Sequence, residues 1–129
     1  MSMTRLPVVE AGEVLREASI NGIDNICLYR VPPETQDASD STTVLLTEVT
    51  EDLTNYGSDK FQDRNQSVEL QIFFSTKEDV DIDTIERQIE SIFLAKKWRI
   101  RLSRAHTVDP TTEQLVKIYY LDRTERNDF

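Results

Sequence analysis

The chain has 129 residues, of which 38% are hydrophobic and 30% are charged, as is typical of one soluble globular domain. A net charge of −9 argues against a protein that binds nucleic acid over a broad face. No apolar run approaches the ~18 residues that are needed to cross a bilayer. One cysteine excludes an internal disulfide. We expect a single domain over residues 1–129 whose ends, 1–5 and 123–129, fray.

A stripe at helical spacing predicts a first helix, with Val8, Ala11, Leu15 and Ala18 on one side. Gly22 ends this helix, because glycine takes left-handed dihedral angles at low cost. A short strand is predicted at residues 25–31, and the two prolines that follow it end the strand. Residues 34–42 then form a loop, and a second strand occupies residues 42–49.

A dozen polar residues follow, and we predict a long loop at residues 52–65 that contains Tyr56 and Phe61. The third strand, at residues 67–74, has the clearest alternation, with Val68, Leu70, Ile72 and Phe74 on one face. Asp81 can cap a second helix, whose apolar stripe consists of Ile82, Ile85, Ile89, Ile92 and Phe93.

Two further strands complete the predicted order. In the fourth, at residues 98–103, Trp98, Ile100 and Leu102 face the core while Arg99 and Arg101 point outward together. In the fifth, at residues 114–122, Val116, Ile118 and Tyr120 share a face. The order α-β-β-β-α-β-β predicts an α+β fold, with about five strands in a mostly antiparallel mixed sheet and two helices covering one face.

No catalytic, cofactor or metal site is predicted, so we expect no enzyme. His106 has only Asp109 and Glu113 near it in sequence, which gives no nucleophile–base pair. Cys27 lies in an apolar strand and is expected to be inert. The aspartates at positions 79, 81 and 83 lack the glycine and distal glutamate of a calcium loop, so helix capping explains them better.

Charge is unevenly distributed along the chain. Residues 34–90 carry four basic and fifteen acidic groups, a net of −11, whereas residues 91–129 carry eight basic and five acidic groups, a net of +3. Opposite faces of this kind can join copies head to tail, or can simply be solvated. The cluster at residues 96–104 has five basic groups, and Arg99 and Arg101 in it fit a partner's carboxylates, a phosphate backbone or solvent.

The stretch TVLLTEVTEDLTNYGSDKFQDRNQSVELQIFF, an Asp-rich helix start and KKWRIRLSRAHTVDPTTEQLVKIYYL resemble the tail-component proteins of long-tailed bacteriophages of Gram-positive hosts. Within them, the Tyr56-Gly57 loop, Trp98 and the His106 to Asp109-Pro110 pattern carry most of the resemblance. That family is similar in size and element order to phage tail terminators, which form a hexameric ring on the tail tube.

The resemblance implies a non-enzymatic virion protein that assembles in the host cytoplasm and then lies at the head-proximal end of the tail. Its implied partners are copies of itself, the major tail tube protein and the head–tail connector proteins, with no membrane and no sequence-specific nucleic acid. Tyr56, Phe61, Arg99 and Arg101 are the candidate interface residues. The alternatives are a head–tail connector or stopper component, or a small α+β module that binds a ligand between helix and sheet. The loop aromatics could also fold back on the sheet.

Overall fold

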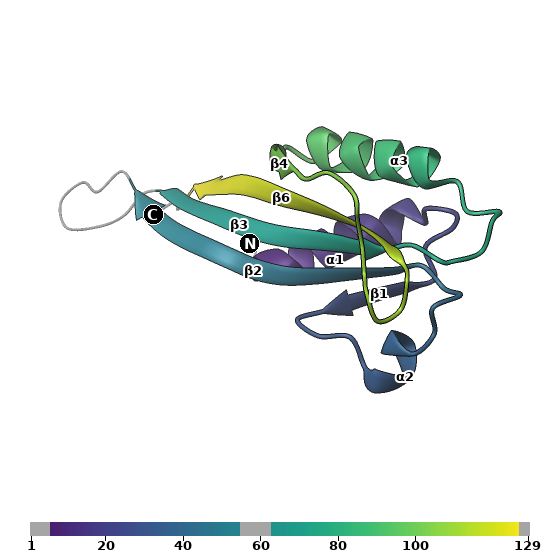
Figure 1. Cartoon of the computed structure of the whole chain (residues 1–129). Coiled ribbons are helices and arrows are strands. Elements are labelled where there is room, and N and C mark those ends of the chain that lie inside the picture. Colours follow the sequence, from purple (N-terminus) through teal and green to yellow (C-terminus); the bar gives the residue numbers. More distant parts are fainter. Residues whose placement is uncertain (1–5, 55–62, 127–129) are drawn as a thin grey trace.

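The computed structural model describes residues 6–54 and 63–126 (Figure 1). Its elements are α1 (Pro7–Ala18), β1 (Asn25–Leu28), α2 (Pro33–Gln36), β2 (Thr43–Thr54), β3 (Asp63–Phe73), α3 (Ile82–Ala95), β4 (Arg99–Ser103), β5 (Thr107–Val108) and β6 (Leu115–Arg126). The sheet runs β1-β2-β3-β6-β4, with β5 also paired to β6. Among the strands of the described residues, only β1 and β2 pair in parallel. The predicted α+β fold with a mostly antiparallel mixed sheet is confirmed.

The Asp81 cap acts as predicted, whereas α1 ends at Ala18 and not at Gly22. Ser19 follows α1 with a left-handed φ of 49°, and Gly22 has a φ of 103° in the turn beyond it. At the start of α3 the Asp81 carboxylate accepts hydrogen bonds from the hydroxyl of Thr84 at 2.7 Å and from its backbone N–H at 3.1 Å. These two bonds lower the pKa of Asp81, because they stabilise its charged form.

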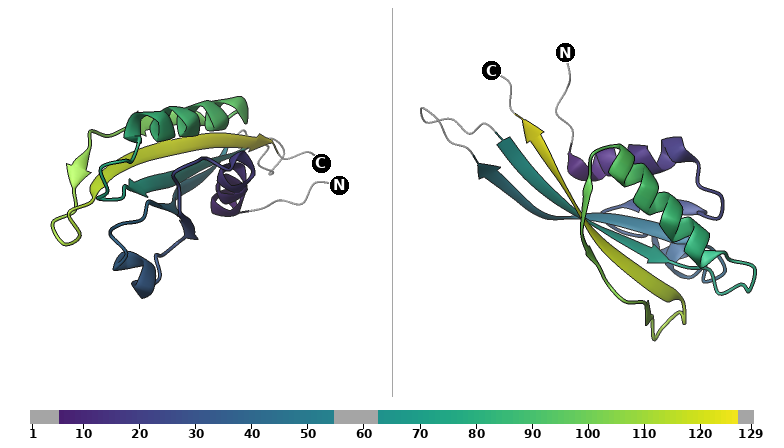
Figure 2. Two further views of the ribbon diagram at one scale, coloured as in Figure 1. Left: turned by 90° about the vertical axis from the view of Figure 1, so that its right-hand side faces the viewer. Right: turned by 90° about the horizontal axis from the view of Figure 1, so that it is seen from above.

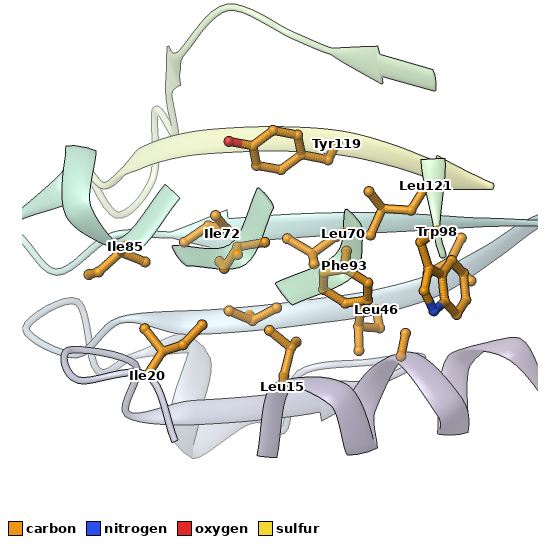
Figure 3. Close-up of a cluster of buried hydrophobic side chains, with 14 of the residues drawn as sticks. Leu15, Ile20, Leu46, Leu70, Ile72, Ile85, Phe93, Trp98, Tyr119 and Leu121 are labelled. Atoms are coloured by element: carbon orange, nitrogen blue, oxygen red, sulfur yellow. The ribbon is translucent and has the colours of Figure 1, made fainter. Parts of the chain in front are cut away.

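The core lies on one face of the sheet, beneath α1 and α3 (Figure 3). Both helix stripes, apart from the exposed Ala18, meet side chains from alternate strand positions: Val44 and Leu46 in β2, Val68, Leu70 and Ile72 in β3, and Tyr119 and Leu121 in β6. Each of these side chains is at most 1% exposed. Burial of a Leu or Ile side chain contributes about 1.5–3 kcal/mol, so this layer is the main source of stability.

The two faces of β6 have different surroundings, since one meets the core and the other lies on the helix-free side of the sheet. Val116, Ile118 and Tyr120 do share a face, as expected, but it is the face away from the helices. Tyr119 and Leu121 occupy the core face instead, opposite Leu70 and Val68 of β3 respectively. An alternating strand rich in apolar residues on both faces does not indicate by itself which face is covered.

The prediction of a loop at residues 52–65 is wrong at both ends. The β2–β3 ladder continues to the Thr54–Asp63 pair, and β6 runs beside β3 to Arg126, within the segment expected to fray. The strands project beyond the helices as a ribbon (Figures 1 and 2).

Polar side chains hold this ribbon together across its strands. Gln66, which is 1% exposed, donates to Glu51 at 2.8 Å and accepts from Arg123 at 2.8 Å, so neighbouring strands are linked without an apolar core. Hydrophobic alternation cannot detect a strand of this kind.

Two smaller elements were also missed. The one-turn helix α2 lies in the connection that we predicted as a loop, and β5 lies between the predicted fourth and fifth strands. β1 ends at Leu28, before the prolines, because Tyr29 takes a left-handed φ of 70°. Over the described part of the chain, no helix is both long and apolar enough to cross a membrane.

Candidate assembly interface

The two sides of the sheet end in unequal edges. On one side β1 pairs only with residues 43–46 of β2, and the Tyr29 N–H donates to the Leu46 carbonyl at 2.8 Å. Within residues 6–54 and 63–126, no strand lies beyond β2 after that point. On the other side, β4 pairs with β6 alone. Both edges therefore offer backbone groups that a further strand can bind.

We name residues 96–108 the basic edge, since they contain five Lys or Arg residues and no Asp or Glu. The side chains of Lys96, Lys97, Arg99, Arg101 and Arg104 are all exposed. We name residues 47–51 of β2 the acidic edge, since this segment contains Glu48 and Glu51 and no basic residue. The charge split expected from sequence therefore falls, in part, on opposite sides of one sheet.

The structure separates the two arginines that we expected to act as a pair. Arg101 Nε lies 3.0 Å from Asp122 Oδ2, and the Arg101 guanidinium also lies over the Tyr120 ring at 5.2 Å. Arg99 stands opposite Asp122 in the ladder but forms no ion pair with any described residue. Arg99 is therefore available to a partner, while Arg101 is engaged within its own chain.

A β-bulge causes this difference. Ile100 pairs with Leu121 and Leu102 with Tyr120, so Arg101 is an extra residue in β4. Alternation breaks at a bulge, and the next side chain changes face. Leu102 is consequently 40% exposed, whereas sequence alternation placed it in the core together with Trp98, which is 3% exposed as predicted.

The acidic edge contains a second bulge. Glu48 pairs with Val68 and Thr50 with Ser67, so Val49 is an extra residue in β2 and is 40% exposed. Beside it, the left-handed residue Tyr29 is 45% exposed. Burial, followed by the charge of Glu48 and a hydrogen bond to it, raises the pKa of the Tyr29 hydroxyl.

Sequence analysis missed these apolar residues at the edges. Tyr29 and Val49 lie at the acidic edge, and Leu102 and Val108 lie at the basic edge, where Val108 is 61% exposed. Positive φ at Tyr29 and the two bulges leave no pattern in the sequence that would reveal them. The other two candidates, Tyr56 and Phe61, lie outside the described residues.

The contacts of His106 and the burial of Cys27 give both residues structural roles. His106 Nε2 lies 2.5 Å from Glu86 Oε2, so it ties the β4–β5 connection to α3, and neither Asp109 nor Glu113 is its partner. Cys27 is half-buried in β1, and burial raises the pKa of its thiol above the ordinary value, which disfavours the reactive thiolate.

Two hollows lie outside the basic and acidic edges. One, of about 440 Å³, lies near the start of α3 and is lined by Asp24, Asp79 and Asp81 among others. Asp24 accepts a 2.7 Å bond from the Thr42 N–H and Asp81 caps α3, so both carboxylates have structural roles. The other, of about 480 Å³, lies on the helix-free face, over Leu45 and Phe73. No group of three or more metal-ligating side chains occurs in the described residues.

Residues 5–125 match the family described as "Protein of unknown function (DUF806)". The chain belongs to that family. No curated protein matches it.

A solved structure resembles the whole chain. It is described as "Cryo-EM Structure of an Extracellular Contractile Injection System, PVC sheath/tube terminator in extended state". The likeness has a TM-score of 0.52 at 9% sequence identity, and it covers 100% of this chain and 59% of the other. At this identity the likeness establishes a shared fold, and the present chain spans less than two thirds of the terminator's length.

Proposed function

We propose that this protein is a non-enzymatic tail terminator, which forms a ring of identical subunits on the end of a tail tube and prepares the tube to join the head. The observation that carries the proposal is the likeness of fold, over the entire chain, to the sheath/tube terminator of a contractile injection system. The independent resemblance of the sequence to phage tail components of Gram-positive hosts supports the same role.

The edges of the sheet supply a physical basis for a ring. A contact between unlike surfaces repeats from copy to copy and closes when the rotation at each step is right. An exposed basic edge and an exposed acidic edge on opposite sides of one subunit are suited to such a contact. By analogy with phage terminators the ring is a hexamer, and its other partners are the tail tube protein and the connector proteins.

The protein would act by binding and positioning alone. Asp81 caps α3, Asp83 pairs with Arg87, Asp24 accepts a bond from the Thr42 N–H, and His106 is paired to Glu86. We accordingly expect no hydrolytic activity and no stoichiometric divalent metal. After assembly in the host cytoplasm, the protein would lie at the head-proximal end of the virion tail.

The test is to add purified protein to tubes polymerised from the major tail protein of the same virion and to inspect the tube ends by electron microscopy. We expect rings at the ends, and native mass spectrometry at rising concentration should show a closed oligomer. A protein that binds isolated connector rings but never tube ends would favour the connector alternative. A protein that stays monomeric at all concentrations and binds no tube would overturn the proposal.

A further inference from the structure

The open edges carry opposite charges, and each presents an exposed apolar side chain. The basic edge presents Arg99, which has no ion-pair partner in the described chain, and the apolar side chain of Leu102. The acidic edge presents Glu48 and the apolar side chain of Val49. Like edges would bring equal charges together, whereas unlike edges match basic to acidic groups and apolar to apolar side chains.

Strand direction also favours the unlike pairing. β2 is antiparallel to β3, β3 to β6 and β6 to β4, so β4 runs antiparallel to β2 within one subunit. A second copy placed beside the first in the same orientation therefore brings its β4 antiparallel to the open part of β2. Antiparallel strands pair directly, with backbone hydrogen bonds perpendicular to the strands.

We propose that copies of this chain join by strand addition, with β4 of one copy pairing along residues 47–51 of β2 in the next. The sheet then continues from subunit to subunit, and the bulged Val49 and the displaced Leu102 meet at the junction. Backbone hydrogen bonds provide affinity in strand addition and side chains provide specificity. The inference rests on the proposed ring and specifies how its subunits contact one another.

Cross-linking between two kinds of subunit tests the contact. In a Cys27→Ser background, one preparation carries Val49→Cys and the other Leu102→Cys, and a short flexible bismaleimide is added to each preparation and to their mixture. We expect covalent dimers chiefly in the mixture, and a ladder of higher oligomers from the chain that carries both cysteines. The control chain carries both Leu102→Cys and Arg87→Cys, and it should give no ladder, because Arg87 is exposed on α3 beside the end of α1 and outside both edges.

A charge reversal gives a second measurement. Arg99→Glu should weaken the ring, because it places an acidic side chain in the basic edge, whereas Arg87→Glu, the same reversal on α3, should leave the ring unchanged. Circular dichroism melting of each variant monomer verifies that the subunit is folded.

The outcomes separate this inference from the proposed function. If the wild type forms rings on tubes but only the Val49→Cys preparation cross-links with itself, the contact joins like edges and the inference is overturned while the function stands. If rings form and neither preparation nor the mixture cross-links, strand addition is again overturned. If the wild type forms no ring and binds no tube, the proposed function fails first.

Discussion

The hydroxyl of Tyr119 in β6 donates a hydrogen bond of 2.6 Å to Glu90 Oε2 of α3. The ring is fully buried among the core side chains (Figure 3), and its hydroxyl joins the sheet to the helix that covers it. Burial, followed by the bond to Glu90 and the charges of Glu86 and Glu90, raises the pKa of Tyr119 far above its ordinary value of 10.0. This contact links α3 directly to β6.

Replacing Tyr119 by Phe should lower the free energy of unfolding by about 1.5–3 kcal/mol, because the hydrogen bond reaches a charged carboxylate. Urea denaturation measures the change. Tyr120→Phe is the matched control, since Tyr120 lies on the helix-free face beneath Arg101 and Arg104 and should stay within about 0.5 kcal/mol of wild type. Equal losses in the two variants would show that the bond contributes nothing.

Alkaline pH should reduce the difference in stability between wild type and Tyr119→Phe. Above pH 10 an unfolded chain releases the Tyr119 proton, whereas the folded chain retains it, so this contribution to stability is present below pH 10 and declines as the pH rises beyond it. Its slope approaches about 1.4 kcal/mol per pH unit. The gap between wild type and Tyr119→Phe should narrow between pH 9 and pH 11, and a constant gap would contradict the assignment.

Protonation of Asp81 at low pH should lower the stability of the folded protein. Its pKa is lowered in the folded state by the hydrogen bonds from Thr84, so its stabilising effect is present above the pKa of the unfolded carboxyl and is lost as the pH falls through the folded value. Asp81→Ala should therefore melt at lower temperature than wild type at pH 7, with the difference shrinking towards pH 2. Asp79→Ala is the control, because the cap of α3 belongs to Asp81. A pH-independent difference would argue against the cap.

The two arginines of β4 should behave differently when reversed. Arg99→Glu should weaken self-association and lower monomer stability by no more than about 1 kcal/mol, because Arg99 has no ion pair in the described chain and the cost is only the repulsion between the new Glu and Asp122 opposite it. Arg101→Glu should also destabilise the monomer, by about 0.2–1 kcal/mol for the lost pair with Asp122 and more for the new repulsion. Sedimentation equilibrium and urea denaturation measure the two effects. Identical profiles would mean that the ion pair does not distinguish the residues.

Gly22 should not tolerate a side chain. Its φ is 103°, and a Cβ there would lie 2.9 Å from Ile85 Cδ1 in the buried face of α3. Gly22→Ala should cost at least about 1 kcal/mol through its backbone conformation alone. The neighbouring Asn21→Ala, at an exposed position, should cost less. Thermal melting of both variants tests this, and an unchanged midpoint for Gly22→Ala would be the contrary result.

The sequence alone determined the α+β fold, the two long helices and the core face of β3. In each case the pattern is local: a stripe at helical spacing, a capping Asp81, or strict alternation from Val68 to Phe74. The same patterns correctly buried Trp98 and exposed Arg99.

Tertiary structure decided the rest, because pairing with distant strands overrides local pattern. The polar ends of β2 and β3 are strand because Gln66 bridges Glu51 and Arg123, which lie far apart in the chain. The bulges depend on how β2 meets β3 and β4 meets β6, and they expose Val49 and Leu102. Which edges stay open follows from the strand order, and a strand's own residues do not encode its neighbours.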